Sequence, residues 1–242
     1  VRRVADDLTG PDSMRDVAFV YFDLDDTLLD HRAAERRALA DLRSEYDVLG
    51  DIPESLLLES YHRINRAVWK TYGDGDLTKV QAKRLRFERL LNELGVPGPD
   101  PSILGDRYLE VYGRHWTYRD GARAAFEAIA ARYPVGIITN GFVEIQRAKL
   151  DRFHEIRERS AVILISEEIG VMKPDPLLFE RAAERAGHAP HRLLYVGDSL
   201  HSDIEGGHRA GWQVAWIDGD EAVAPAGTTC FHRWEDLLGR LL

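Results

Sequence analysis

A short apolar run stands near the start of the chain, and similar runs alternate with amphipathic segments over its second half. Residues 17–24 read VAFVYFDL, an apolar run rich in β-branched and aromatic side chains that stops at aspartates. Such a run is typical of a strand that is buried on both faces of a parallel sheet. Four later runs have the same texture, at 134–139, 161–166, 192–196 and 213–217. Segments with helical spacing accompany them, at 121–133, 142–153, 175–186, 202–210 and 234–242. This alternation predicts an α/β fold with a doubly wound parallel sheet.

The segment between the first strand and the others has a different pattern. Apolar residues recur there every three to four positions among Arg, Glu and Lys, and Pro and Gly separate the stretches. We expect four or five helices and no strand, because this spacing gives each segment one apolar helical face. The helical stretches are 32–46, 54–72, 77–94 and 101–116. The predicted organisation is therefore a core from 15–30 plus 117–242, with an all-helical cap inserted at 31–116.

Composition and charge limit the class of protein. Hydrophobic residues make up 44% of the 242 residues and charged residues 30%, which is the balance of an ordinary soluble domain. The 41 acidic residues outnumber the 32 Lys and Arg, giving a formal net charge of −9. This excess argues against a nucleic-acid polymer as the main partner, because such a partner requires clustered positive charge. The single cysteine, Cys230, excludes an intrachain disulfide and a multi-cysteine metal site.

Nothing in the sequence indicates a membrane or an export signal. No apolar run approaches the ~18–20 residues that span a bilayer. Residues 1–14 contain two arginines but no apolar stretch, so we interpret them as a loose N-terminal leader rather than a signal peptide. We expect the protein to be cytoplasmic and not to bind a membrane.

The ends of four predicted strands carry groups suited to chemistry. In an open α/β sheet the binding crevice lies beyond the carboxyl ends of the strands, so these groups should meet at one edge. No one of the short motifs is specific, but their order and their shared position form a strong signal. The candidate residues are Asp23, Asp25, Thr139, Asn140, Gly141, Lys173, Asp198 and Asp203.

Two of the acids are placed to divide the work of phosphoryl transfer. Asp23 and Asp25 are two residues apart, so an extended backbone would direct both side chains to one side. We expect Asp23 to attack phosphorus and form an aspartyl-phosphate. Asp25 would then protonate the leaving oxygen and later take a proton from the attacking water.

The other groups would balance charge and bind phosphate. Mg²⁺ prefers hard oxygen ligands, so Asp23 and Asp198 are the predicted side-chain ligands, with Asp203 supporting them. Lys173 would offset the remaining negative charge. The hydroxyl of Thr139, together with the backbone amides at 140 and 141, would donate to phosphate oxygens. The chain contains only five lysines against 27 arginines, so a lysine in this loop suggests a need for a compact ammonium.

These motifs resemble the haloacid dehalogenase superfamily. They read DLDDT at 23–27, TNG at 139–141, KP at 173–174 and GDSLHSD at 197–203. The resemblance implies a Rossmann-like core, an aspartate nucleophile, Mg²⁺ and a C1-type helical cap. It also implies that the backbone carbonyl of Asp25 is a metal ligand, beside Asp23, Asp198 and Asp203. The stretches ITNGF and ISEEIGVMKPDPLLF are similar to the branch of pyrimidine 5′-nucleotidases and N-acylneuraminate phosphatases.

The expected function is Mg²⁺-dependent hydrolysis of a small phosphorylated metabolite, a nucleoside 5′-monophosphate or a sugar phosphate, by a monomer or homodimer. Three alternatives stay open: a 2-haloacid dehalogenase, a phosphomutase that uses the same motifs, and a catalytically silent scaffold. Asp25 and the pair of acids at 198 and 203 argue against the dehalogenase, which needs no metal. Single residues also have simpler interpretations, since Lys173 could be a surface lysine and Asp203 a helix cap.

Overall fold

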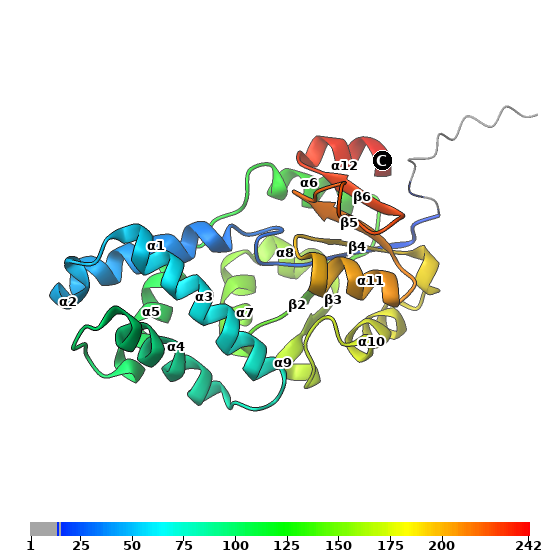
Figure 1. The fold of residues 1–242 in the computed structure, drawn as a ribbon. Coiled ribbons are helices and arrows are strands. Elements are labelled where there is room, and N and C mark those ends of the chain that lie inside the picture. Colours follow the sequence, from blue (N-terminus) through cyan, green and yellow to red (C-terminus); the bar gives the residue numbers. More distant parts are fainter. Residues whose placement is uncertain (1–13, 15) are drawn as a thin grey trace, which may run out of the picture. The chain divides into compact units, whose positions relative to one another are not determined.

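The computed structural model describes Met14 and residues 16–242 (Figure 1). Apart from Met14, the predicted leader over 1–14 lies outside the described residues. The chain divides into two compact units. The core unit consists of the residues up to Leu28 together with Tyr118–Leu242, and the helical unit consists of Leu29–Thr117.

The core unit is built on a six-stranded, all-parallel sheet, which confirms the predicted α/β class. The strand order is β3-β2-β1-β4-β5-β6, so β1 lies between β2 and β4. In β1, Val20 is in register with Val135 on one side and with Leu194 on the other. The strands are β1 (Phe19–Phe22), β2 (Val135–Thr139), β3 (Ser160–Ile165), β4 (Leu193–Gly197), β5 (Gln213–Ile217) and β6 (Thr228–Phe231). This order is that of a doubly wound sheet: successive strands are added on one side of β1 up to β3, and on its other side from β4 onward.

Helices cover both faces of the sheet. Figure 1 shows α6 (Ala122–Ala130) and α12 (Trp234–Leu241) on one side of it, and α10 (Pro176–Ala186) and α11 (Glu205–Arg209) on the other. Phe22 of β1 contacts Phe126 of α6, with ring centroids 5.5 Å apart. Tyr21 packs on the opposite face against Trp212, at 5.3 Å. Successive residues of a strand point to opposite faces, so burial on both faces produces the continuous apolar run seen in the sequence.

Several shorter elements of the core unit were not predicted. The edge strand β6 and the helices α8 (His154–Arg159) and α9 (Ser166–Ile169) have no counterpart in the sequence expectation. The helix expected over 202–210 is instead a π-helical turn, η2 (Leu200–Ile204), followed by α11. The remaining elements are α7 (Val143–Arg152) and the 3₁₀ turn η1 (Pro190–Arg192).

The helical unit contains five helices, and none of its residues, all of which are described, forms a strand. One of these helices, α4 (Lys79–Leu94), is capped at both ends: Thr78 and Gln81 form a reciprocal capping box at its start, and Gly95 ends it in a left-handed conformation. Tyr61, Phe87 and Tyr108 pack together in its interior, with ring centroids 5.2–5.6 Å apart. The helices are α1 (His31–Glu45), α2 (Asp47–Gly50), α3 (Glu54–Gly73), α4 (Lys79–Leu94) and α5 (Pro101–Arg114).

The interior of the helical unit also holds charged groups. The buried carboxylate of Glu35 lies 2.6 Å from Nε2 of His62. The buried guanidinium of Arg86 lies over the ring of Tyr108, 5.0 Å from its centroid.

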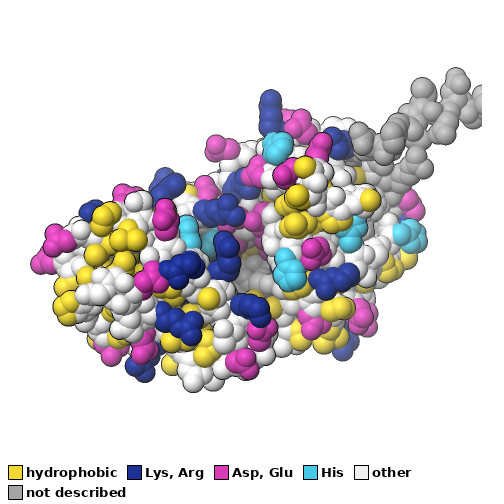
Figure 2. Space-filling view, viewed as in Figure 1, with side chains coloured by type: hydrophobic (Ala, Val, Ile, Leu, Met, Phe, Trp, Pro, Cys, Tyr) yellow, Lys and Arg dark blue, Asp and Glu magenta, His cyan; other side chains and the backbone are white. Residues whose placement is uncertain are grey.

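In Figure 2 acidic and basic side chains are interspersed on the visible face of each unit. Within the described part of the chain, no helix combines the length and the apolar character needed to cross a bilayer.

Candidate active site

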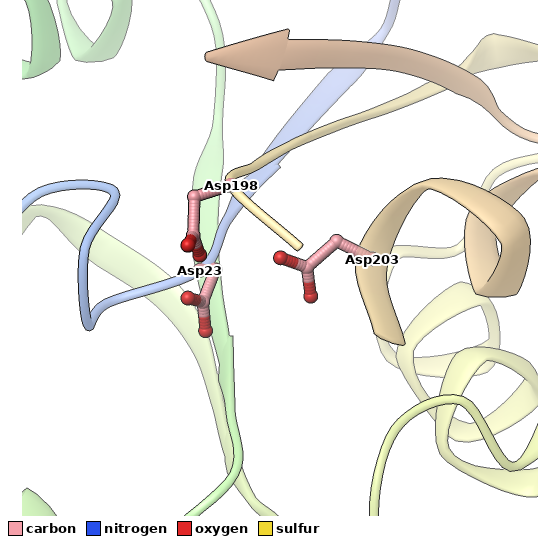
Figure 3. Close-up of side chains that lie close together, drawn as sticks. All are labelled: Asp23, Asp198 and Asp203. Atoms are coloured by element: carbon pink, nitrogen blue, oxygen red, sulfur yellow. The ribbon is translucent and has the colours of Figure 1, made fainter. Parts of the chain in front are cut away.

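Three carboxylates meet at the carboxyl ends of the central strands. Asp23 follows β1 and Asp198 follows β4, and because these strands are neighbours the two acids emerge side by side; the Asp23 amide donates to the carbonyl of Val196 at 2.9 Å. Asp203 reaches the same place from η2. Figure 3 shows the Asp23 and Asp198 side chains together, with Asp203 opposite them. One carboxylate oxygen from each acid lies within 4.8 Å of the others, so the three could hold one metal ion.

A glycine allows Asp203 to approach the end of β4 closely. A Cβ added at Gly197 would lie 2.4 Å from Oδ2 of Asp203, so a side chain at this position would collide with the carboxylate. The same oxygen accepts a hydrogen bond from the amide of Ser199 at 3.0 Å. The loop at residues 197–199 therefore packs closely around Asp203.

Lys173 bridges two of the carboxylates. Its side chain is buried, and its Nζ lies 2.5 Å from Oδ1 of Asp23 and 2.8 Å from Oδ1 of Asp203. Nζ also donates to the hydroxyl of Tyr195 at 2.8 Å, and that hydroxyl donates to the carbonyl of Ile138 at 2.9 Å. Tyr195 was not singled out from the sequence. Its hydroxyl completes the surroundings of a buried ammonium, which would otherwise lack a third partner.

Burial and crowding perturb the acidity of this cluster. Burial, and the charges of Asp203 and Asp25, raise the pKa of Asp23 well above its ordinary value, although Lys173 opposes the change. Burial, followed by the charges of Asp23 and Asp203, likewise raises the pKa of Asp198. Burial acts to lower the pKa of Lys173, but the Asp203 and Asp23 carboxylates outweigh it and raise that pKa. Three carboxylates thus face one ammonium, and a divalent cation would relieve the excess negative charge.

The Thr139-Asn140-Gly141 loop is joined to the loops around it. The Asn140 side chain accepts from the amide of Lys173 at 2.8 Å and donates to the carbonyl of the same residue at 3.0 Å. The Gly141 amide donates to Oγ of Ser166 at 3.1 Å. The fully buried Thr139 hydroxyl accepts from Nε2 of Gln146 at 2.5 Å, which leaves its own proton available for donation.

Asp25 has buried partners that the sequence reasoning missed. Nζ of Lys149 lies 2.6 Å and 2.7 Å from the two carboxylate oxygens of Asp25. Nε2 of Gln146 donates to one of these oxygens at 3.1 Å. One signal was available: Lys149 and Lys173 are the only lysines in the core unit, since the other three of the chain lie in the helical unit.

Comparison with known proteins identifies the family. The family model of haloacid dehalogenase-like hydrolases matches residues 18–211. The chain is 32% identical over 229 residues to the pyrimidine 5′-nucleotidase YjjG of Escherichia coli K12, covering 91% of this chain and 97% of that protein. It is 34% identical over 202 residues to the pyrimidine 5′-nucleotidase PynA of Streptococcus pneumoniae, covering 83% of each. Its structure resembles that of YfnB from Bacillus subtilis bound to magnesium, with a TM-score of 0.81 and 29% identity over 94% of this chain and 99% of that one. The chain belongs to the haloacid dehalogenase-like hydrolases.

Proposed function

We propose that this hydrolase is a Mg²⁺-dependent phosphatase that acts on a nucleoside 5′-monophosphate or a sugar phosphate through an aspartyl-phosphate intermediate. The observation that carries the proposal is the buried cluster in which Lys173 lies 2.5 Å from Asp23, beside Asp198 and Asp203. The names of the two nucleotidase relatives support phosphomonoester hydrolysis as the reaction and a nucleotide as the substrate.

The first half-reaction transfers the phosphoryl group to the enzyme. A carboxylate oxygen of Asp23 forms a bond to phosphorus while the bond from phosphorus to the ester oxygen breaks. The Asp25 carboxyl donates its proton to that leaving oxygen, which departs as an alcohol. Without this proton the alcohol would leave as an alkoxide, a much poorer leaving group.

The second half-reaction restores the enzyme. Water attacks phosphorus, and the bond between phosphorus and the Asp23 oxygen breaks, releasing inorganic phosphate. Asp25, now a carboxylate, takes a proton from the water and is ready for the next cycle. Each half-reaction therefore leaves Asp25 in the protonation state that the other requires.

The remaining groups bind charge. Lys173 offsets the negative charge of nucleophile and substrate, and the Thr139 hydroxyl donates to a phosphate oxygen. The amides at 140 and 141 are further donors, the second of which would exchange its bond to Ser166 for one to phosphate. We propose that the helical unit is the C1 cap of this hydrolase, since it is inserted directly after the strand that carries Asp23 and Asp25.

The donor set fits Mg²⁺, because this hard cation prefers carboxylate and carbonyl oxygens, and three carboxylates already converge. Asp23, Asp198 and the backbone carbonyl of Asp25 would hold the ion, with Asp203 next to them. When bound, Mg²⁺ would supply positive charge that reduces the repulsion between the nucleophile and the anionic phosphate.

The test is phosphate release from a panel of nucleoside monophosphates and sugar phosphates, measured with Mg²⁺ and with EDTA. We expect Mg²⁺-dependent release from the wild-type protein, and its loss in Asp23→Asn. Asp236→Asn, which changes an exposed acid of α12, is the control and should keep full activity. Full activity of Asp23→Asn would refute the mechanism. Release of chloride from chloroacetate in EDTA, without phosphatase activity, would establish a dehalogenase instead.

A further inference from the structure

A buried ammonium lies against the acid/base residue rather than the nucleophile. The Lys149 side chain is about as buried as that of Lys173, each with 3% of its surface exposed, whereas 23% of the Asp25 side chain remains open. Removing an ammonium from water is unfavourable unless it is closely paired. Lys149 is paired with both oxygens of Asp25, at 2.6 Å and 2.7 Å, so its burial is explained by that carboxylate.

The same helix supplies a second donor. Gln146 precedes Lys149 by three residues in α7, so both side chains lie on one face of the helix. Nε2 of Gln146 lies 3.1 Å from Asp25 and 2.5 Å from Oγ1 of Thr139. A Cβ at Gly141 would come within 2.8 Å of the Gln146 side chain, so the glycine leaves the space that this amide occupies. One helical face thus connects the acid/base residue to the phosphate-binding loop.

We infer that Lys149, together with Gln146, is a positioning residue that fixes the direction of the Asp25 carboxylate for both proton transfers. The inference rests on the proposed function, in which Asp25 is the acid and the base. An aspartate side chain with one contact can rotate about two bonds, among three staggered positions about the first and over a broad range about the second. Contact with both oxygens restricts both rotations, and proton transfer needs the reacting atoms within about 2.6–3.2 Å.

The choice of lysine supports this role. The chain uses arginine 27 times and lysine five times, yet both lysines of the core unit contact proposed catalytic acids, Asp23 and Asp25. An ammonium is compact and can donate to two oxygens of one carboxylate from within a tight packing environment. A guanidinium is larger and planar, so it needs more room for the same contact. Lys149→Arg should therefore restore the charge but only part of the geometry.

The experiment compares two leaving groups in the wild-type protein and in Lys149→Met, which keeps most of the length of the side chain and removes its charge. p-Nitrophenyl phosphate releases a stable phenolate and needs no proton from Asp25, whereas an alkyl phosphate needs one. General acid catalysis is worth about 10²–10⁴-fold. We expect kcat/KM of Lys149→Met to fall by about 100-fold or more for the alkyl phosphate, and by less than about tenfold for p-nitrophenyl phosphate.

The second readout is the time course with p-nitrophenyl phosphate. Because the water step still requires Asp25 as a base, Lys149→Met should release a burst of one nitrophenolate per enzyme, followed by slow turnover. Lys149→Arg should recover at least about a tenth of the alkyl-phosphate activity. Arg147→Met is the matched control on the same helix, since Arg147 is half exposed and pairs with Glu168; it should match the wild-type protein in both assays.

The outcomes separate the inference from the proposed function. If the wild-type protein releases no phosphate, or if Asp23→Asn stays active, the proposed function fails. If the wild-type protein is active and depends on Asp23, but kcat/KM of Lys149→Met falls equally for the two substrates or falls for neither, the positioning role of Lys149 is refuted. Should Lys149→Met fail to fold, Gln146→Leu takes its place. Its kcat/KM should also fall more for the alkyl phosphate than for p-nitrophenyl phosphate, but by a smaller factor.

Discussion

Replacing Tyr195 with phenylalanine removes one buried oxygen and leaves the aromatic ring in place. That hydroxyl accepts from Nζ of Lys173 at 2.8 Å and donates to the carbonyl of Ile138 at 2.9 Å. The ring packs edge-on against Phe179 and Trp212, with centroids 5.7 Å and 6.3 Å away. Because these ring contacts persist in the variant, the substitution isolates the polar contacts of the hydroxyl, which also include a longer one of 3.4 Å to Oδ1 of Asp203.

The structure provides a matched control in the adjacent strand. Tyr21 is equally buried, and its hydroxyl donates to the carbonyl of Ala182, a neutral partner, at 2.8 Å. A neutral hydrogen bond is worth about 0.5–1.5 kcal/mol and one to a charged group about 1.5–3 kcal/mol. Tyr21→Phe should therefore lower the free energy of unfolding by about 1 kcal/mol, and Tyr195→Phe by about 2–4 kcal/mol.

The assay is thermal unfolding of both variants in the same buffer. For a chain of this size each kcal/mol lowers Tm by about 2–4 °C, and the two variants should differ by about 1–3 kcal/mol, so Tyr195→Phe should melt about 2–12 °C below Tyr21→Phe. Phosphatase kcat should fall by about tenfold in Tyr195→Phe, which corresponds to 1.4 kcal/mol lost at Lys173, and stay unchanged in Tyr21→Phe. Equal Tm and equal kcat in the two variants would show that the contact with Lys173 contributes nothing.

Three further outcomes are expected. Gly197→Ala should lower the free energy of unfolding by about 1–3 kcal/mol and should also reduce activity, because its methyl group would collide with Asp203; unchanged urea unfolding would contradict the packing. Adding Mg²⁺ should raise Tm, and the increase should be larger at higher pH because protons compete with the ion for the carboxylates. Asp198→Asn should show no such increase when Tm is measured at rising Mg²⁺ concentrations. Burial would raise the pKa of Glu35, but the His62 hydrogen bond and nearby positive charges hold it below its usual value, whereas that same bond raises the pKa of His62. The stabilisation from Glu35 is thus lost as pH falls through its lowered pKa, and the stabilisation from His62 is lost as pH rises through its raised pKa. The free energy of unfolding, measured in urea, should therefore be highest between these two pKa values, and His62→Gln should weaken its fall on the alkaline side.

Most of the sheet could be predicted because its strands are buried on both faces and read as unbroken apolar runs. β6 could not, since it is a four-residue edge strand, TTCF, whose first two residues are only partly buried. The turn η2 was also missed, because the periodicity of 202–210 is helical but Asp203 must face the strand ends. The local sequence pattern carries no information about where Asp203 lies in the folded chain.

The acids of the site were predictable from topology alone, since parallel strands deliver their carboxyl ends to one edge. Their buried partners were not. Tyr195 reads as one more apolar residue of a strand, and nothing in the sequence shows that its hydroxyl contacts Lys173. Lys149 reads as a polar position on a helix, and it becomes buried because Asp25, 124 residues earlier, lies against it.

The central position of β1 determines when the site can form during synthesis. Val20 pairs with Val135 and Leu194, residues that leave the ribosome after the whole helical unit has been made. Pairings over such long separations form slowly and late, because the loop between them must first be closed. The first strand and its two aspartates therefore stay unpaired on the nascent chain until β2 and β4 emerge. A chain interrupted before β4 would expose an apolar strand without a working site, making it a substrate for chaperones and proteases rather than a partial enzyme.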